Sequence, residues 1–188
     1  MRTQMRAIGF VAALALAGMG ILRAKAQEPA KPGPEMEKLG FLVGTWNVVS
    51  KYEKTPLFPN GGEAKGTYAG KWGPGRFSVV ADFGATGGPE GAIQGHEVIT
   101  WDEKAKAYKQ FIFGNNFPGA FQATGRWEGE KLVFEGELEF GGTLMRFRNE
   151  ATTDADGSVT MRESYSAGDS PRVLMITTRG VKTGRAEK

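Results

Sequence analysis

The chain contains no cysteine and only one histidine, His96. The lack of thiols excludes disulfides, cysteine nucleophiles, thiolate zinc sites and iron–sulfur clusters. A single imidazole also leaves no room for a metal site built on several histidines. We therefore expect a fold that is stable without cross-links, and we expect neither a metal ion nor a cofactor.

Long hydrophobic runs are absent except at the start of the chain. There, residues 7–22 are mostly apolar and follow Arg2 and Arg6, and residues 24–26 (Ala-Lys-Ala) have the small-x-small pattern of a cleavage site. The run is shorter than the ~20 residues of a membrane-spanning helix. An uncleaved anchor is the alternative, but the pattern favours a signal peptide over residues 1–26. We therefore expect an exported protein, periplasmic or secreted, with no stable membrane anchor after cleavage.

An excess of basic residues is absent once the leader is removed. The full chain has 24 basic and 21 acidic residues, and four of the basic residues but none of the acids lie in the leader, which leaves 20 against 21. Nucleic-acid binding depends on a basic surface. We therefore expect no nucleic-acid partner.

Proline is concentrated just after the leader. Residues 27–34 contain three of the nine prolines, a composition typical of a tether. Residues 35–182 have the length of one domain, and residues 183–188 remain as a C-terminal tail. Glu35 and Glu37 follow Pro34, which predicts a short helix of about two turns at the start of the domain.

Helix-length periodicity is absent beyond Trp46, and ten short segments of strand-like pattern take its place. In residues 131–140, Leu132 and Phe134 share one face and the glutamates that follow share the other. The turns between segments are short and rich in Gly and Asp, which is typical of β-hairpins. The sequence thus predicts an all-β fold: an antiparallel up-and-down β-barrel of about ten strands. A two-sheet sandwich is the alternative, but it requires longer crossovers.

The Gly-Thr-Trp at residues 44–46, between the predicted helix and the first strand, resembles the start of the lipocalin and fatty-acid-binding-protein group. In that group the Trp packs across one end of the barrel and a basic residue of the last strand lies over it. The resemblance implies a calycin-like barrel closed at one end by Trp46 and Arg179. The alternative is an ordinary core tryptophan and a solvated arginine.

The middle of the chain resembles an uncharacterised bacterial family, the domain of unknown function 1579, over roughly residues 36–181. The family pattern has a Gly-Trp-like start, a Gly-His-x-x-x-x-Trp-Asp hairpin with a Tyr beyond it, and a Gly-Arg-aromatic-x-Gly stretch. The matching positions are Trp46, Gly95, His96, Trp101, Asp102, Tyr108, Gly125, Arg126, Trp127 and Gly129. The resemblance implies a barrel and no known activity, and the long leader and tether depart from the family pattern.

Two glutamates share strand faces with apolar residues. Glu97 alternates with Ile99 and Trp101, and Glu163 alternates with Met161 and Tyr165. Both carboxyl groups enter the lumen if these faces point inward, and both are solvated if the faces point outward. By the same alternation we expect Arg146 and Arg148 outside, because Met145 and Phe147 share the other face.

His96 is the one side chain that titrates near neutrality without a large shift. A structural role, contact with a ligand, and a haem-binding or catalytic role are all open for it. The Gly-rich residues 84–95 are expected to form a rim loop, and in the loop 114–119 Phe117 is expected at the barrel mouth. Together the candidate ligand-binding residues are His96, Glu97, Trp101, Phe117, Glu163 and Tyr165, and we assign no catalytic residue.

Three functions remain open from the sequence. The first is a binding module that holds a small, largely apolar molecule in the barrel lumen. The second is an enzyme in which Glu97, Glu163 and His96 converge as acid and base groups. The third is a structural or interaction protein with a filled core. We expect the binding module rather than an enzyme.

Overall fold

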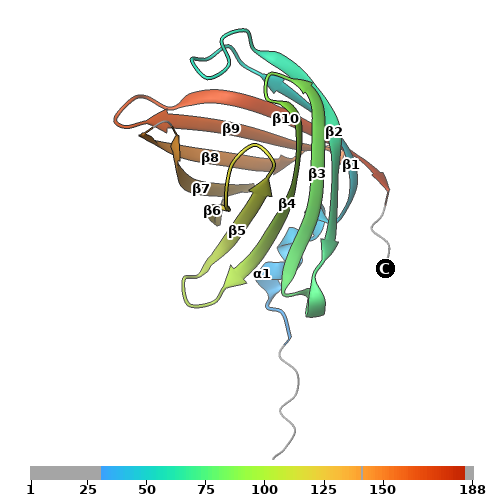
Figure 1. The fold of residues 1–188 in the computed structure, drawn as a ribbon. Helices are drawn as coiled ribbons and strands as arrows, with labels where there is room; N and C mark the ends of the chain where they lie inside the picture. The colour runs from blue at the N-terminus through green and yellow to red at the C-terminus, as the bar shows by residue number, and fades with distance from the viewer. Residues whose placement is uncertain (1–30, 141, 185–188) are drawn as a thin grey trace, which may run out of the picture. The chain divides into compact units, whose positions relative to one another are not determined.

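The computed structural model describes residues 31–140 and 142–184. Ten strands form a closed antiparallel barrel in which each strand pairs with its neighbours in sequence and the last strand closes on the first (Figure 1). The predicted fold class is confirmed. The predicted signal peptide, most of the tether and the end of the tail lie outside the described residues.

A short helical segment, α1 (Pro34–Glu37) and η1 (Lys38–Leu42), precedes the barrel. The strands are β1 (Gly44–Tyr52), β2 (Gly62–Trp72), β3 (Ser78–Gly88), β4 (Gly91–Asp102), β5 (Ala107–Gly114), β6 (Phe121–Glu128), β7 (Lys131–Phe140), β8 (Thr143–Thr153), β9 (Val159–Ala167) and β10 (Val173–Gly184), with a short η2 (Pro74–Arg76) between β2 and β3. No helix among these residues is long and apolar enough to cross a membrane.

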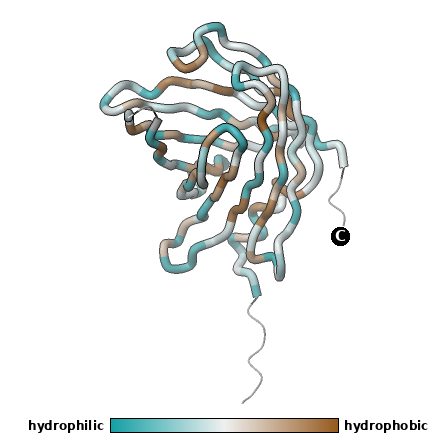
Figure 2. The backbone as a smooth tube through the Cα atoms, viewed as in Figure 1, coloured by the Kyte–Doolittle hydropathy of each residue, from teal (hydrophilic) through white to brown (hydrophobic). Residues whose placement is uncertain are grey.

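Hydrophobic and hydrophilic residues succeed one another along the strands (Figure 2), and successive side chains of a strand point to opposite faces of the wall. On β7, Leu132 and Phe134 are buried while Glu135 and Glu137 lie on the outer face. The turns use the backbone freedom of glycine where it is required: Gly129 and Gly157 adopt φ values of 62° and 80° in the β6–β7 and β8–β9 hairpins. The alternation therefore determines which side chains lie inside the barrel, and the turn glycines determine the hairpin connections.

The prediction of a rim loop over residues 84–95 is wrong. Strand β3 continues to Gly88, β4 begins at Gly91, and only Pro89 and Glu90 form the turn. The glycines lie in strands because the register shifts between Ala85 and Gly88, and Gly87 and Gly91 adopt positive φ at the irregularity. This long hairpin extends the barrel wall and carries Glu90 to the rim.

The helical segment closes one end of the barrel, and the main core lies there. Met36 and Leu39 are 2% and 0% exposed and pack with buried residues of the wall. These wall residues are Val79, Ile99, Tyr108, Ala123, Leu132, Phe134 and Ala151. We call this end, with its helical segment, the closed end.

A polar contact ties the helical segment to the wall. The Tyr108 hydroxyl donates to the backbone carbonyl of Glu35 at 2.8 Å and accepts a hydrogen bond from Trp127 Nε1 at 3.1 Å. Burial raises the pKa of Tyr108 to about 12, so the phenol keeps its proton and acts as a donor. The helix is thereby fixed in position as well as packed.

Trp46 is buried next to the closed end, but Arg179 does not lie over it. The Lys182 ammonium takes that place, 5.0 Å from the centre of the Trp46 ring, and donates to the carbonyl of Val43 at 2.7 Å. Arg179 pairs in register with Val49 on the outer face, where it donates to Asp156 at 2.5 Å. The resemblance implied the wrong residue because Lys182, not Arg179, shares the inward face with Trp46.

Candidate ligand site in the barrel lumen

The pairing register decides which side chains enter the lumen. Side chains directly opposite each other in neighbouring strands share a face, and Glu97 lies opposite Ala81 on β3 and Ile112 on β5. Ala81 is 3% exposed, so this is the inner face. Glu97 therefore lies inside the barrel, and the alternative of a solvated outer position is wrong for it.

Glu163 also faces inward, from the opposite part of the wall. Its neighbours on the same face of β9 are Met161, which packs against the main core, and Tyr165, which belongs to a second cluster with Met145 and Met175. Glu163 pairs with Asn149 on β8 and Ile176 on β10. The lumen thus contains two carboxyl groups on different walls.

Two donors hold Glu97. The Tyr68 hydroxyl donates to one carboxyl oxygen at 3.0 Å, and the Gln110 amide donates to the other. Burial raises the pKa of Glu97, and the two donors oppose that rise because they favour the ionised form. Burial and the charge of Glu97 together raise the pKa of Tyr68 well above its usual value. Glu97, Tyr68 and Gln110 thus form a hydrogen-bonded polar cluster on a mostly apolar part of the inner wall.

Glu163 has no hydrogen bond or ion pair with the residues that the structure describes. Burial raises its pKa to about 7, and the negative charge of Glu90 adds to the effect. Protein surrounds the carboxyl group on all sides, yet the residue keeps part of its accessible surface. The pairing register places Glu163 on the inner face of the wall, opposite Asn149 and Ile176.

The rim opposite the closed end is held together by Glu90. Its two oxygens accept hydrogen bonds from the Tyr52 hydroxyl at 2.8 Å and the Asn116 amide at 3.1 Å. These contacts join the end of β1, the β3–β4 turn and the β5–β6 loop, which also contains Phe117. Burial, followed by the hydrogen bond to Glu90, raises the pKa of Tyr52.

Side-chain packing differs between the two ends of the lumen. At the closed end the inward-facing Val79, Ile99 and Leu132 are each 1% exposed. Towards the rim, inward-facing apolar residues keep part of their accessible surface. These include Val48, Phe83, Ile112, Phe121, Phe147 and Ile176. Inward-facing apolar residues of the rim half therefore keep some accessible surface, although Phe147 and Ile176 also pack against the second cluster.

The structure separates the remaining predicted candidates. His96 lies on the outer face, where it contacts Asp82, and the two side chains are 72% and 66% exposed. Trp101 packs edge to face on Tyr108 at the closed end, with ring centres 5.1 Å apart. Tyr165 is buried in the second cluster, and Phe117 lies in the rim loop. Glu97, Glu163 and His96 do not converge, because His96 points out of the wall at the position next to Glu97.

Three polar side chains of the candidate site, Gln110, Tyr68 and Glu90, are not among the residues predicted from the sequence. Gln110 lies between Tyr108 and Ile112 on one face of β5, so a polar residue on an apolar face was the signal. Tyr68 lies two residues before Gly70, where an added Cβ would come within 3.0 Å of the Tyr68 ring. Glu90 had no such signal, because its role depends on the wrongly predicted loop.

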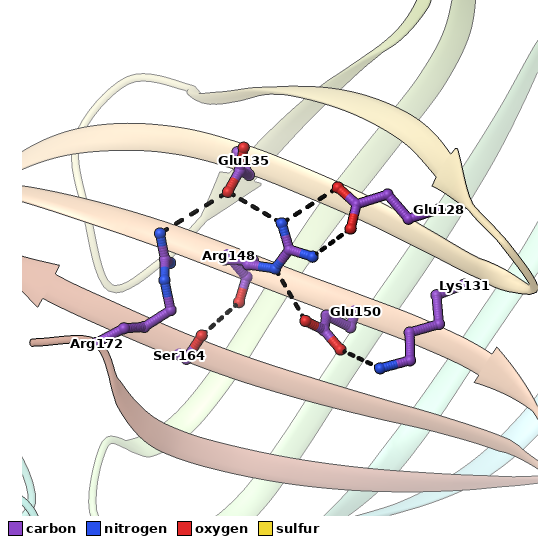
Figure 3. A network of polar contacts seen from close by, with 7 residues as sticks. All are labelled: Glu128, Lys131, Glu135, Arg148, Glu150, Ser164 and Arg172. Carbon is purple, nitrogen blue, oxygen red and sulfur yellow. Dashed lines mark hydrogen bonds and ion pairs between the residues drawn. The ribbon is translucent and has the colours of Figure 1, made fainter.

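The most extensive polar network lies outside the barrel (Figure 3). Arg148 contacts Glu128 at 2.6 Å, Glu150 at 2.9 Å and Glu135 at 3.2 Å, which joins β6, β7 and β8. Hydrogen bonds from Arg148 hold the pKa of Glu128 and of Glu150 below the usual range. The outward position of Arg148 confirms the prediction, and the network links three strands on the outside of the barrel.

No group of acidic or histidine side chains in the described ranges could hold a metal ion.

Comparison with known proteins identifies the fold and goes no further. No protein-family model matches the sequence, and no curated protein matches it. Among solved structures, Rv2717c from M. tuberculosis is similar with a TM-score of 0.53 and 11% identity, over 81% of this chain and 99% of that one. The S-type phycobiliprotein lyase CPES from Guillardia theta is similar with a TM-score of 0.50 and 10% identity, over 79% of this chain and 90% of that one. The likeness to these two structures is one of fold, the closed antiparallel barrel.

Proposed function

We propose that the protein is an exported barrel that holds a small, largely apolar ligand in its lumen. One observation carries the proposal: inward-facing apolar side chains in the rim half, such as Phe83, Ile112 and Phe147, keep part of their accessible surface. Transfer of apolar surface out of water contributes about 25 cal/mol per Å². An apolar ligand between these walls gains that contribution.

The luminal polar groups provide orientation. Binding sites for small molecules are mostly apolar with a few placed polar groups. Here Glu97 is held by two donors on one wall, and Glu163 is free of a partner in the described part of the chain on another. A ligand with one polar end can be aligned by either group.

Binding of the neutral fluorophore N-phenyl-1-naphthylamine tests the proposal. Thr178 faces the lumen, where it shares a hydrogen bond of 2.7 Å with Ser50, and the adjacent Thr177 faces outward. We expect saturable binding that Thr178→Trp weakens at least tenfold, because the indole occupies luminal space, while Thr177→Trp leaves it unchanged. Absence of saturable binding, or equal loss in the two variants, would contradict the proposal. Native mass spectrometry of protein from its own cells then identifies the ligand.

Export is part of the same proposal and is supported by the leader pattern of residues 1–26. N-terminal sequencing of the protein from its own cells tests it. The expected first residue is Gln27, in the exported fraction. An intact Met1 in the cytoplasmic fraction would overturn this part alone.

We also infer membership of the uncharacterised family 1579. The inference is supported by the contacts among residues of the matching pattern. Trp101 packs on Tyr108, Trp127 donates to Tyr108, and a Cβ at Gly125 would overlap the ring of Phe134. The structure of any member of that family tests it, and the expected result is the same Trp–Tyr–Trp contact beside a short helix.

A further inference from the structure

The charges on the inner face of the barrel are of one sign wherever a ligand can reach them. Among the described inward-facing positions, two carry carboxyl groups, Glu97 and Glu163, and one carries a basic group, Lys182. The Lys182 ammonium donates to the Val43 carbonyl and covers Trp46 at the closed end. It is therefore engaged and lies away from the rim half.

Glu163 is the group that needs a partner. Its carboxyl group is surrounded by protein, faces the lumen, and has no hydrogen bond or ion pair in the described part of the chain. An ionised carboxylate in such surroundings is costly unless a cation or a donor contacts it. The neighbouring Asn149, opposite it in register, provides no charge. A donor from the ligand would complete the site.

The rim adds a further negative charge. Glu90 accepts hydrogen bonds from Tyr52 and Asn116, which are both uncharged donors, so its charge is not neutralised by them. Its charge acts on both Glu163 and Tyr52. A cation that enters at this rim is attracted, and an anion is repelled by carboxylates along its path.

We propose that the luminal site selects apolar molecules with a protonated amine head group, bound by Glu163, over those with a carboxylate head group. This rests on the proposed function and names the class of its ligand. The apolar tail lies between Phe83, Ile112 and Phe147, and the ammonium donates to Glu163. A carboxylate at the same position would face two carboxyl groups with no accessible basic side chain in the described lumen.

Competition between matched ligands tests this proposal. Decylamine, decanol and decanoate, each below the concentration at which it aggregates, compete with N-phenyl-1-naphthylamine at pH 8. A charge-assisted hydrogen bond predicts that decylamine binds about ten- to one-hundredfold more tightly than decanol, with decanoate weaker than both. Glu163→Gln should reduce the advantage of decylamine over decanol at least tenfold. The control is Glu139→Gln, which removes the same charge from the exposed face of β7 and should leave the order unchanged.

The outcomes separate the two proposals. If the neutral fluorophore does not bind, the proposed function fails. If it binds but decanoate competes as well as decylamine, the ligand class is overturned while the binding function stands. An equal amine advantage in Glu163→Gln and in the unmodified protein overturns the role of Glu163. The order of the three ligands on the unmodified protein decides the ligand class even if Glu163→Gln does not fold.

Discussion

Replacement of Glu163 by glutamine should stabilise the protein above neutral pH. Burial raises the pKa of this carboxyl from 4.5 to about 7. The folded state therefore binds a proton that the unfolded state has already released between these values, so the free energy of unfolding falls as pH rises from about 4.5 to about 7. Glutamine has nearly the same shape but does not ionise, so the free energy of unfolding of the variant does not fall with pH for this reason.

The magnitude follows from the shift. A difference of about 2.5 pH units, at about 1.4 kcal/mol per unit, sets an upper limit of about 3.5 kcal/mol for the destabilisation by ionised Glu163. Below about pH 4 the two proteins should be equally stable within about 0.5 kcal/mol, because Glu163 is then protonated in both the folded and the unfolded state. At pH 8 the variant should exceed the unmodified protein by up to about 3.5 kcal/mol.

Urea unfolding at intervals between pH 4 and pH 8, followed by tryptophan fluorescence, measures this difference. The control is Glu139→Gln on the exposed outer face, whose difference from the unmodified protein should not depend on pH in this range. A difference between Glu163→Gln and the unmodified protein that stays constant with pH, or a variant that is less stable at pH 8, would refute the reasoning.

Three further variants test the remaining features of the fold. Leu39→Ala should lower the free energy of unfolding by about 2–5 kcal/mol, because Leu39 is 0% exposed in the closed end, and urea unfolding measures it. Lys182→Ala should lower the free energy of unfolding by about 1 kcal/mol, because the contact with Trp46 is lost. Arg179→Ala, which removes an exposed ion pair, should lower it by less than about 0.5 kcal/mol. A larger loss for Arg179→Ala than for Lys182→Ala would contradict the placement of these two side chains. Arg148→Ala should lower the melting temperature less at 1 M salt than at low salt, because salt screens the exposed partners of this network, and an effect independent of salt would contradict that account.

The barrel was predictable because alternation and turn chemistry act locally. The pattern of β7, with Leu132 and Phe134 on one face and glutamates on the other, is independent of the rest of the chain. The hairpin turns at Gly129 and Gly157 are equally local. Ten strands joined by nine consecutive hairpin connections, with no crossover, leave few arrangements other than a closed barrel.

The site was only partly predictable because it depends on register. Alternation places Glu97 on the same face as Ile99, but only the pairing with the buried Ala81 shows that this face points inward. The choice between Arg179 and Lys182 depends on which of them lies across from Trp46, and one strand carries both. The role of Glu90 is not predictable, because glycine-rich sequence is equally compatible with a loop and with an irregular hairpin.

The pairing of β1 with β10 sets the order of events when the protein is made. Ser50 and Thr178, which hydrogen-bond across this seam, are 128 residues apart in the chain. The barrel cannot close until nearly the whole chain has been synthesised, and contacts over such sequence separations form slowly. A polypeptide of this topology therefore lacks its closing strand pair throughout most of its synthesis.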